Sequence, residues 1–164
     1  MSSITYLQGS LFDAPQEAIL THACNTKGQM NSGIAFAFKS LMFSAFRNYE
    51  AYCLKHGVAW SVRSPLVGRS FLTSDDKGRQ MLCLFTSDAY GKGVDRPELI
   101  ITQTISSIEH FMNSDYVKSH AVPISIHSNK FNSGLFRVPW SETENIINSA
   151  LANHPNLQWT VWEM

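Results

Sequence analysis

The alternation of short apolar segments with longer helical segments along the whole chain most constrains its fold. Segments of strand length and composition lie at residues 4–7, 18–22, 65–71, 81–86, 122–126 and 158–162. The turn sequence at 74–78 predicts a hairpin between two of these strands. Because strands and helices intermix without repeats or a linker, we expect one α/β domain over residues 1–164. Its central mixed sheet should lie between two layers of helices.

Several local signals set the expected helix boundaries. Helices are predicted over residues 33–41 and 46–55, and Gly57 stands where a left-handed C-cap is favoured. Pro97 begins a third helix. Ser141 and Glu144 form a capping box that begins a fourth. The buried stripe of the third helix is expected to contain Ile101, Ile105, Ile108 and Met112.

The charge balance excludes some classes of partner. Thirteen basic residues match thirteen acidic ones in 164 residues, and the formal net charge is +0. A chain without a basic excess has no electrostatic basis for a strong nucleic-acid patch or for binding an anionic membrane. It also has no heptad pattern, so we expect a monomer. An anionic ligand would be held by backbone N–H groups and helix N-termini instead.

The cysteines and histidines argue against disulfides and metals. Cys24, Cys53 and Cys83 are odd in number, widely spaced and without a CxxC pair. His56, His110, His120 and His154 show no metal-ligand spacing. We therefore expect no metal and no cofactor, and a reducing location in the cytoplasm or the nucleus.

The loop at residues 22–35 is the first candidate for ligand binding. It leaves an apolar strand and enters a helix, and Gly28 and Gly33 let its backbone turn tightly and approach a ligand. The start of the helix offers unpaired N–H groups and the positive end of the helix dipole to an anion. The alternative is an ordinary glycine-containing connection between a strand and a helix.

The loop at residues 132–140 is the second candidate. Consecutive N–H groups around Gly134 would form a concavity suited to phosphate oxygens. We expect Phe136 to be exposed and to pack on a sugar or a base. For Trp140, directly before the expected helix cap, we expect a core position.

Taken together and in order, the motifs of this chain resemble those of the macrodomain family. The motifs are Ile4-Thr5-Tyr6-Leu7-Gln8-Gly9-Ser10-Leu11, His22-Ala23-Cys24-Asn25, Gly33-Ile34-Ala35, Ser133-Gly134-Leu135-Phe136 and Pro139-Trp140. The most similar branch contains ADP-ribose 1''-phosphate phosphatases and the terminal ADP-ribose–protein glycohydrolase. The resemblance implies a three-layer α/β/α fold with ADP-ribose lying across the crest of the sheet.

The resemblance also implies which residues contact the ligand. Leu11 would offer backbone contacts near the adenine, and Asn25 would face the distal ribose. The other residues placed at the ligand are Ser10, Gly33, Ile34, Ala35, Ser133, Gly134, Leu135 and Phe136.

Two departures from the family pattern bear on the chemistry. Many macrodomains have an aspartate that accepts the adenine amino group where this chain has Ser10. Asp13 is close enough in sequence to replace that aspartate, and the alternative for Asp13 is a turn residue before Pro15. The glycohydrolases use a lysine nucleophile, and this chain has Ser87 or Asp88 at the corresponding position. They also use an aspartate in the second loop, where this chain has Phe136. We therefore expect the lysine mechanism to be absent.

For a phosphatase, His22 is the predicted general acid–base, because an unperturbed imidazole titrates near neutrality. Asn25 would orient the distal ribose, and Asp88 would act as a base or as an orienting carboxylate. The structural alternatives are a buried, satisfied histidine at position 22 and a strand-end cap at Asp88.

Three functions follow. The first is dephosphorylation of ADP-ribose 1''-phosphate, a small-molecule ADP-ribose derivative. The second is removal of ADP-ribose from a modified protein or nucleic acid. The third is non-catalytic reading of ADP-ribose, consistent with the few strong catalytic groups in the two loops.

Overall fold

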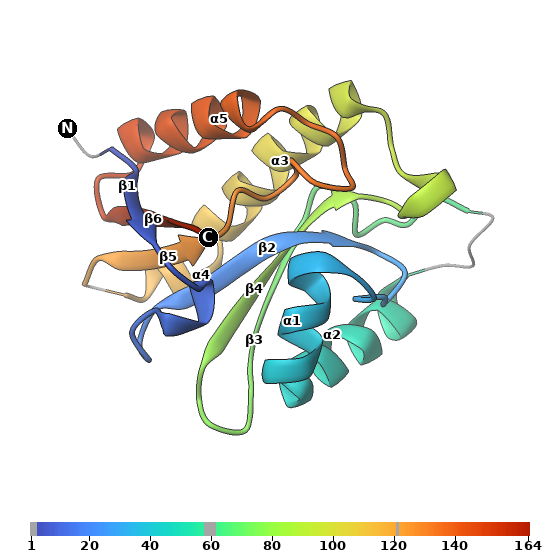
Figure 1. Ribbon diagram of the computed structural model, residues 1–164, viewed down its shortest axis with the longest axis horizontal. Helices are drawn as coiled ribbons and strands as arrows, with labels where there is room; N and C mark the ends of the chain where they lie inside the picture. The colour runs from blue at the N-terminus through green and yellow to red at the C-terminus, as the bar shows by residue number, and fades with distance from the viewer. Residues whose placement is uncertain (1–2, 58–61, 121) are drawn as a thin grey trace.

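The protein, described here from a computed structural model over residues 3–57, 62–120 and 122–164, contains a six-stranded mixed sheet (Figure 1). The strands are β1 (Thr5–Gln8), β2 (Ile19–Asn25), β3 (Ser70–Ser74), β4 (Gln80–Ser87), β5 (Ile124–Ser128) and β6 (Leu157–Glu163). Their order in the sheet is β1-β6-β5-β2-β4-β3. Only β3 runs antiparallel to its neighbour, so the carboxyl ends of the other five strands gather at one edge.

Helices cover both faces of this sheet. They are α1 (Gly33–Leu41), α2 (Phe43–His56), α3 (Pro97–Met112), α4 (Asp115–Lys118) and α5 (Trp140–Asn153), with 3-10 turns η1 (Leu11–Asp13) and η2 (Gly91–Gly93). Figure 1 shows α1 and α2 on one side of the sheet and α3 and α5 on the other. The expected three-layer arrangement is confirmed.

The continuous apolar character of the central strands follows from these two layers. In β2, Leu20 belongs to the core beneath α1 and α2, whereas Ile19 belongs to the core beneath α3 and α5. Both residues are at most 2% exposed. A strand that is covered on both faces needs apolar side chains at successive positions rather than at alternate ones. This requirement explains the continuous apolar run Met81–Phe85 within β4.

Two expected helix ends were wrong. Gly57 has extended backbone angles (φ −83°, ψ −174°) rather than left-handed ones. Helix α5 begins at Trp140 with Pro139 as its N-cap, so Ser141 and Glu144 already lie inside the helix and make no capping box. Proline fixes φ near the value that a helix start requires, and here it sets the boundary instead of the hydroxyl.

Two other local expectations were also shifted. The strand expected at 65–71 begins only at Ser70, because residues 65–68 form a turn. On α3, Ile105 is 49% exposed, and Ile100 and Phe111 are buried with Ile108. The hydrophobic stripe expected on α3 therefore overlaps only partly with the buried face of the helix. The hairpin expected at 74–78 is confirmed by the antiparallel pairing of β3 with β4.

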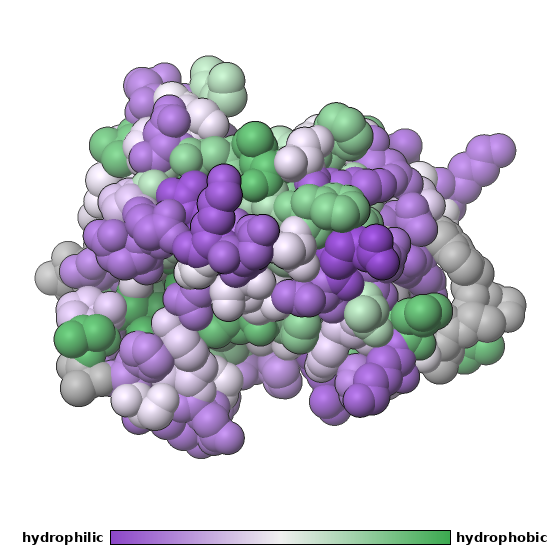
Figure 2. All heavy atoms as spheres, turned by 90° about the horizontal axis from the view of Figure 1, so that it is seen from below, coloured by the Kyte–Doolittle hydropathy of each residue, from purple (hydrophilic) through white to green (hydrophobic). Residues whose placement is uncertain are grey.

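Part of the molecular surface is hydrophobic. On the face shown in Figure 2, hydrophobic side chains lie in separate groups among hydrophilic ones. Leu41, Phe43 and Leu54, at α1 and α2, are among the large hydrophobic residues that remain exposed. Across the described residues, no helix combines the length and the apolar character that crossing a membrane requires.

Candidate ligand-binding and active site

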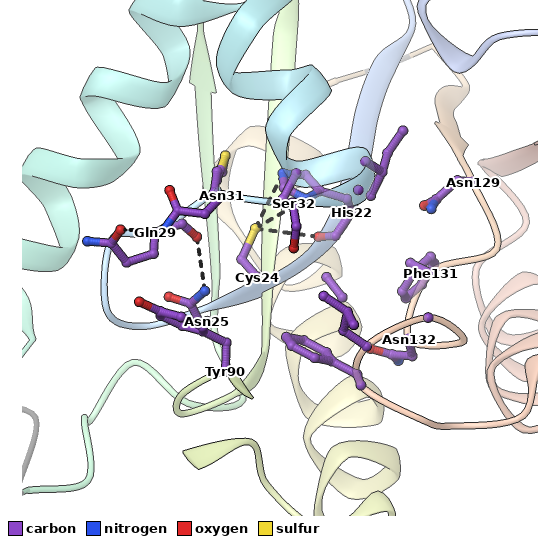
Figure 3. A pocket seen from close by; sticks show the side chains of 18 of the residues that line it. His22, Cys24, Asn25, Gln29, Asn31, Ser32, Tyr90, Asn129, Phe131 and Asn132 are labelled. Atoms are coloured by element: carbon purple, nitrogen blue, oxygen red, sulfur yellow. Dashed lines mark hydrogen bonds between the residues drawn. The ribbon is translucent and has the colours of Figure 1, made fainter. Parts of the chain in front are cut away.

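A pocket of about 470 Å³ opens at the carboxyl ends of β2, β4 and β5, between the N-terminus of α1 and the segment 129–136 (Figure 3). It therefore brings together the two loops that the sequence singled out. The predicted site residues that line it are His22, Asn25, Gly33, Ile34, Ala35, Gly134, Leu135 and Phe136. The four that do not line it are Ser10, Leu11, Asp88 and Ser133.

One wall of the pocket is the N-terminus of α1. Gly33 begins the helix with φ +59°, a left-handed angle that favours glycine. The first intrahelical bond runs from the Phe36 N–H to the Ser32 carbonyl, so the N–H groups of Gly33, Ile34 and Ala35 lack an acceptor within the helix. Ser32 is exposed and its hydroxyl makes no capping bond. This wall is a site of positive potential for an anion.

The opposite wall is the loop after β5, fixed at both ends by hydrogen bonds. Asn132 adopts φ +67°, and its side-chain amide accepts from Thr86 and donates to Thr104, both at 2.9 Å. At the other end, the Val138 N–H donates to the Asn132 carbonyl at 2.8 Å. Between these anchors Leu135 is 71% exposed and Phe136 half-buried. The expected exposed aromatic at 136 is thus a partly covered wall residue.

His22 does not have the surroundings that the predicted acid–base role requires. Its ring is fully buried and stacks on Phe38, with ring centroids 4.0 Å apart and planes inclined by 11°. Its Nε2 lies 3.5 Å from Cys24 Sγ. Burial lowers the pKa of His22 to about 3, because the charged imidazolium would lose its hydration. His22 is therefore neutral at neutral pH, and the structure supports the alternative of a packed core histidine.

Asn25 lines the pocket, but its amide is already engaged within the protein. Its Nδ2 donates to the Gln29 carbonyl at 3.0 Å, and its Oδ1 accepts from the Lys27 N–H at 2.9 Å. The Tyr49 hydroxyl reaches the same oxygen at 3.2 Å. The side chain thus shapes the first loop. The predicted orientation of the distal ribose by this amide stays a prediction, and Asn25 lies in the pocket lining where that role requires it.

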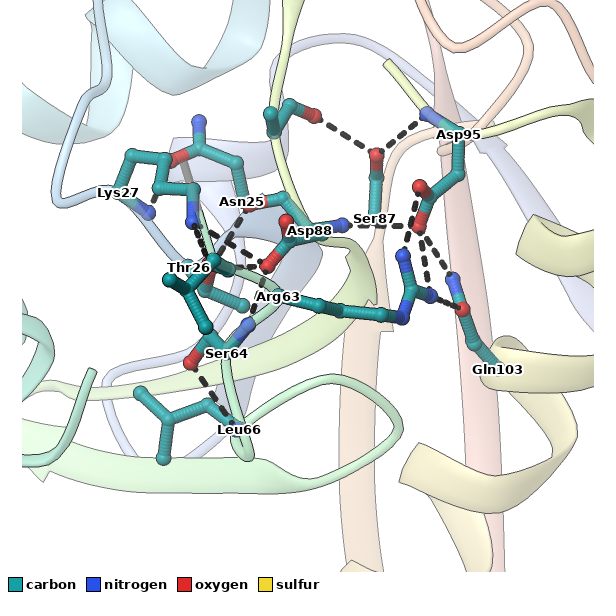
Figure 4. Close-up of polar contacts among 12 residues, drawn as sticks. Asn25, Thr26, Lys27, Arg63, Ser64, Leu66, Ser87, Asp88, Asp95 and Gln103 are labelled. Carbon is teal, nitrogen blue, oxygen red and sulfur yellow. Dashed lines mark hydrogen bonds and ion pairs between the residues drawn. The ribbon is translucent and has the colours of Figure 1, made fainter. Parts of the chain in front are cut away.

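Asp88 also serves the loops rather than the pocket. Its Oδ1 accepts from the Thr26 hydroxyl at 3.0 Å, from the Ser64 N–H at 2.9 Å and from Lys27 Nζ at 3.3 Å (Figure 4). The side chains of Lys27 and Asp88 are only 2% and 13% exposed. The catalytic role predicted for Asp88 is corrected accordingly, because its carboxylate joins three chain segments away from the pocket lining.

A second carboxylate extends this network. Asp95 accepts from the Arg63 guanidinium at 3.0 and 3.1 Å, from the Asp88 N–H at 3.0 Å and from Gln103 Nε2 at 3.0 Å. Burial opposes the ionisation of Asp95. These donors nevertheless hold the pKa of its carboxyl below the ordinary value. Asp88 and Asp95 together fix the segment that leads from β4 into η2 (Figure 4).

The remaining predicted contacts lie outside the pocket. The Ser10 hydroxyl accepts from the Phe12 N–H at 3.2 Å and caps η1, and Leu11 is 3% exposed within the core. The Ser133 hydroxyl donates to the Lys130 carbonyl. A backbone contact from Leu11 to the adenine stays a prediction. The placement of Ser10 and Ser133 in the pocket lining is corrected, because both hydroxyls bond locally.

The pocket also contains residues that sequence reasoning did not single out. They are Ala23, Cys24, Gln29, Met30, Asn31, Ser32, Tyr90, Gly91, Asn129, Lys130, Phe131 and Asn132. Those from 23 to 32 belong to the first loop, so the boundaries of that loop were their signal. Asn129 and Lys130 directly follow β5. Their position after a strand of a parallel sheet was the only signal available.

Three buried residues beneath the pocket could in principle hold a soft metal ion. Ligand atoms of His22, Cys24 and Cys83 lie within 4.8 Å of one another. Burial raises the pKa of the Cys24 thiol well above its ordinary value, so this sulfur is protonated at neutral pH. A structural zinc site takes four ligands, and the cluster found among the described residues offers three. Metal independence stays a prediction.

Comparison with solved structures identifies the class of fold. The macrodomain of Mycobacterium tuberculosis DarG superposes with a TM-score of 0.75 over 100% of this chain and 99% of that one, at 20% sequence identity. At this identity the likeness concerns the fold, and the fold is that of the macrodomains. No family model matches the chain.

Sequence comparison with curated proteins is more specific. The ADP-ribose 1''-phosphate phosphatase of Candida albicans is 36% identical over 168 residues, which cover 97% of this chain and 98% of the relative. The protein of the same name from Meyerozyma guilliermondii is 32% identical, over 90% of this chain and 93% of the relative. The chain belongs to the macrodomain family of the ADP-ribose 1''-phosphate phosphatases.

Proposed function

We propose that this protein binds ADP-ribose derivatives in the pocket between α1 and the segment 129–136, and that it hydrolyses ADP-ribose 1''-phosphate to ADP-ribose and phosphate. The observation that carries the proposal is the meeting of two anion-binding loops in one pocket of about 470 Å³. The names of the relatives supply the substrate class.

The binding of phosphate groups follows from the α1 wall. The free N–H groups of Gly33, Ile34 and Ala35 and the helix dipole attract negative charge without any basic side chain. This local attraction suits a chain of zero net charge. The aromatic ring of Phe136 and the apolar side chain of Ile34 offer flat and apolar surfaces for the sugars.

The chemistry that we propose does not use His22, which is buried and neutral, or Asp88, which lies outside the pocket lining, as a general acid or base. Water adds to phosphorus, the bond from phosphorus to the anomeric oxygen breaks, and that oxygen receives a proton as ADP-ribose leaves. An anomeric hydroxyl is more acidic than an ordinary alcohol, so the departing oxygen needs less help from a general acid. We therefore assign the main catalytic effect to N–H groups that stabilise the charge developing on the phosphoryl oxygens.

The α1 wall can be tested by replacing Ser32 with aspartate. An aspartate at this N-cap would stabilise the helix, because it caps free N–H groups and interacts favourably with the dipole. The same charge would repel a phosphate in the pocket. We expect S32D to lower the affinity for ADP-ribose about ten-fold at low salt without lowering the melting temperature. The matched neutral control S32N should cap the helix and retain affinity within a few-fold.

The activity itself is tested by incubating the protein with ADP-ribose 1''-phosphate without added metal and following ADP-ribose by chromatography and phosphate by colorimetry. Equimolar release of both products, reduced in S32D and retained in S32N, is the expected result. Calorimetric binding of ADP-ribose with no release of phosphate would contradict the phosphatase. Such a result would favour the non-catalytic reader, which the buried and neutral state of His22 already supports as second candidate.

A further inference from the structure

The side chain of Asn129 is an unused hydrogen-bonding group in the wall of the pocket. Its residue directly follows β5 and lines the pocket. Its Oδ1 is buried and has no hydrogen-bond partner. The other buried side-chain atom in this condition among the described residues is Arg79 Nε, outside the pocket lining. A buried acceptor without a donor is costly, at about 1–3 kcal/mol, so this oxygen calls for a donor from the ligand.

The position of Asn129 indicates which part of an ADP-ribose molecule it meets. Figure 3 shows Asn129 across the pocket from Asn25 and Gln29. In the sheet, β5 lies between β2 and β6, and β6 packs against η1. Asn129 is therefore on the side of the pocket that faces the β6 edge and η1, with the α1 wall for phosphate between the two ends. A ligand that places its distal ribose near Asn25 directs its base toward Asn129.

Two neighbouring acceptors at this edge, the Ser10 hydroxyl and the Glu163 carboxylate, are already engaged. The Ser10 hydroxyl accepts from the Phe12 N–H, as described above. The Glu163 carboxylate accepts from Lys130 Nζ at 2.6 Å and from Gln8 Nε2 at 3.2 Å. Asn129 thus combines an unpartnered acceptor with a position in the pocket lining.

A carboxamide is complementary to adenine in a specific way. Its oxygen accepts from the exocyclic amino group while its NH₂ donates to an adjacent ring nitrogen. Hypoxanthine carries a carbonyl oxygen in place of the amino group and would oppose the buried oxygen with a second acceptor. We propose that Asn129 is a specificity-determining residue that selects adenine over other purines in the ADP-ribose derivatives bound here. This inference rests on the proposed function.

The proposal is tested by calorimetry with ADP-ribose and with its hypoxanthine analogue, inosine diphosphate ribose, which shares both sugars and the diphosphate. The unaltered protein should bind ADP-ribose about ten-fold more tightly or better, as expected for one good amide–base pair. N129L should lose this preference to within about two-fold, mainly by weaker binding of ADP-ribose. N129D keeps an acceptor for the amino group and should retain the preference. The exposed substitution N148L, on α5, is the matched control and should change neither affinity.

The outcomes separate the two proposals. Equal losses for both ligands in N129L, or no loss for either, would overturn the assignment of Asn129 to the base and leave the proposed function standing. If the unaltered protein binds neither ligand, both proposals fail. If N129L does not fold in a thermal melt, N129D and N129A carry the comparison, with preference retained in the first and lost in the second.

Discussion

The two ends of the pocket differ in what their polar side chains do. At the end formed by residues 25–29 and the nearby segment 88–95, the polar side chains of Asn25, Asp88 and Asp95 bond to other parts of the protein. At the end formed by 129–136, Asn132 and Lys130 are likewise bonded within the protein, but Asn129 Oδ1 has no partner and Leu135 is 71% exposed.

This difference teaches that chemically attractive residue types are a poor guide to ligand contacts. A loop that must hold one shape beside a ligand needs hydrogen bonds of its own, and it uses carboxylates and amides for them. The hydrogen-bonding groups that remain available to a ligand are those without a partner inside the protein. We therefore treat the first end as the support and the second as the reading surface, and the following predictions are designed to break or sharpen that division.

The largest effect is expected from Asp88→Ala. Removal of this carboxylate deletes its 3.3 Å ion pair with the buried Lys27 ammonium and the acceptor of the Ser64 N–H. Breaking a buried pair on one side destabilises a protein strongly, and we expect a loss of about 3 kcal/mol in the free energy of unfolding. Urea denaturation measures it, with Asp76→Ala at an exposed position as the control.

The conservative change Asp88→Asn separates support from catalysis. It retains an acceptor for the Ser64 N–H, so turnover measured well below the melting temperature should stay within a few-fold of the unaltered protein. A hundred-fold loss of turnover in a folded D88N protein would show that Asp88 acts in the chemistry. It would contradict the division of the pocket into a supporting end and a ligand-contacting end.

A pH-dependent effect that is smaller, for each pH unit, than the loss in Asp88→Ala is expected from His22. Its pKa is about 3 in the folded protein and near 6.5 in the unfolded chain, so the unfolded state binds the proton first. Stability from this group is therefore complete above pH 6.5 and falls as the pH decreases toward 3, by about 1.4 kcal/mol per pH unit. Urea titrations at several pH values measure the slope.

The control for this slope is His22→Gln, which removes the titrating group. The difference in slope between the two proteins isolates His22 from His110 and His127, whose pKa values are also lowered by burial. An imidazole resonance of His22 that titrates near pH 6.5 in NMR spectra would contradict the buried, neutral state and revive the acid–base mechanism.

The smallest effect concerns the reading surface. Phe136 is half-buried in the pocket wall and belongs to neither hydrophobic core. Phe136→Ala should weaken ADP-ribose binding about five- to ten-fold, because the ring loses its contact with the sugar, while the free energy of unfolding changes by less than about 1 kcal/mol. Calorimetry and urea denaturation measure the two quantities. A stability loss as large as that of Asp88→Ala would assign Phe136 to the support instead.

Much of the fold could be predicted because hydrophobic patterning reflects burial on two faces. The bounds of α1, Gly33–Leu41, were predicted as observed, and all six strands were located. The start of α5 was missed because Pro139 and Ser141 are competing signals two residues apart, and only packing selects between them. The predicted buried face of α3 was rotated away from the observed one, because the observed buried side includes polar residues, among them Gln103 and Thr104.

Of the site, the loops could be predicted but the roles of their residues could not. Glycine and strand–helix transitions are local features, and they located residues 33–35 and 134–136 correctly in the pocket. Whether an amide such as Asn25 is free or occupied depends on partners distant in the sequence, such as Tyr49. Asn129 has no neighbouring motif, and only its lack of a partner in the folded protein distinguishes it.

The placement of β1 bears on how the chain is completed during synthesis. This edge strand pairs only with β6, so Thr5 lies beside Thr160 although 155 positions separate them. On the ribosome, the amino-terminal strand must wait, unpaired, until residues 157–163 have left the exit tunnel. Closure of so long a loop is slow compared with local contacts. Nascent chains stalled before β6 should therefore leave β1 accessible to proteases even when the central strands have already assembled.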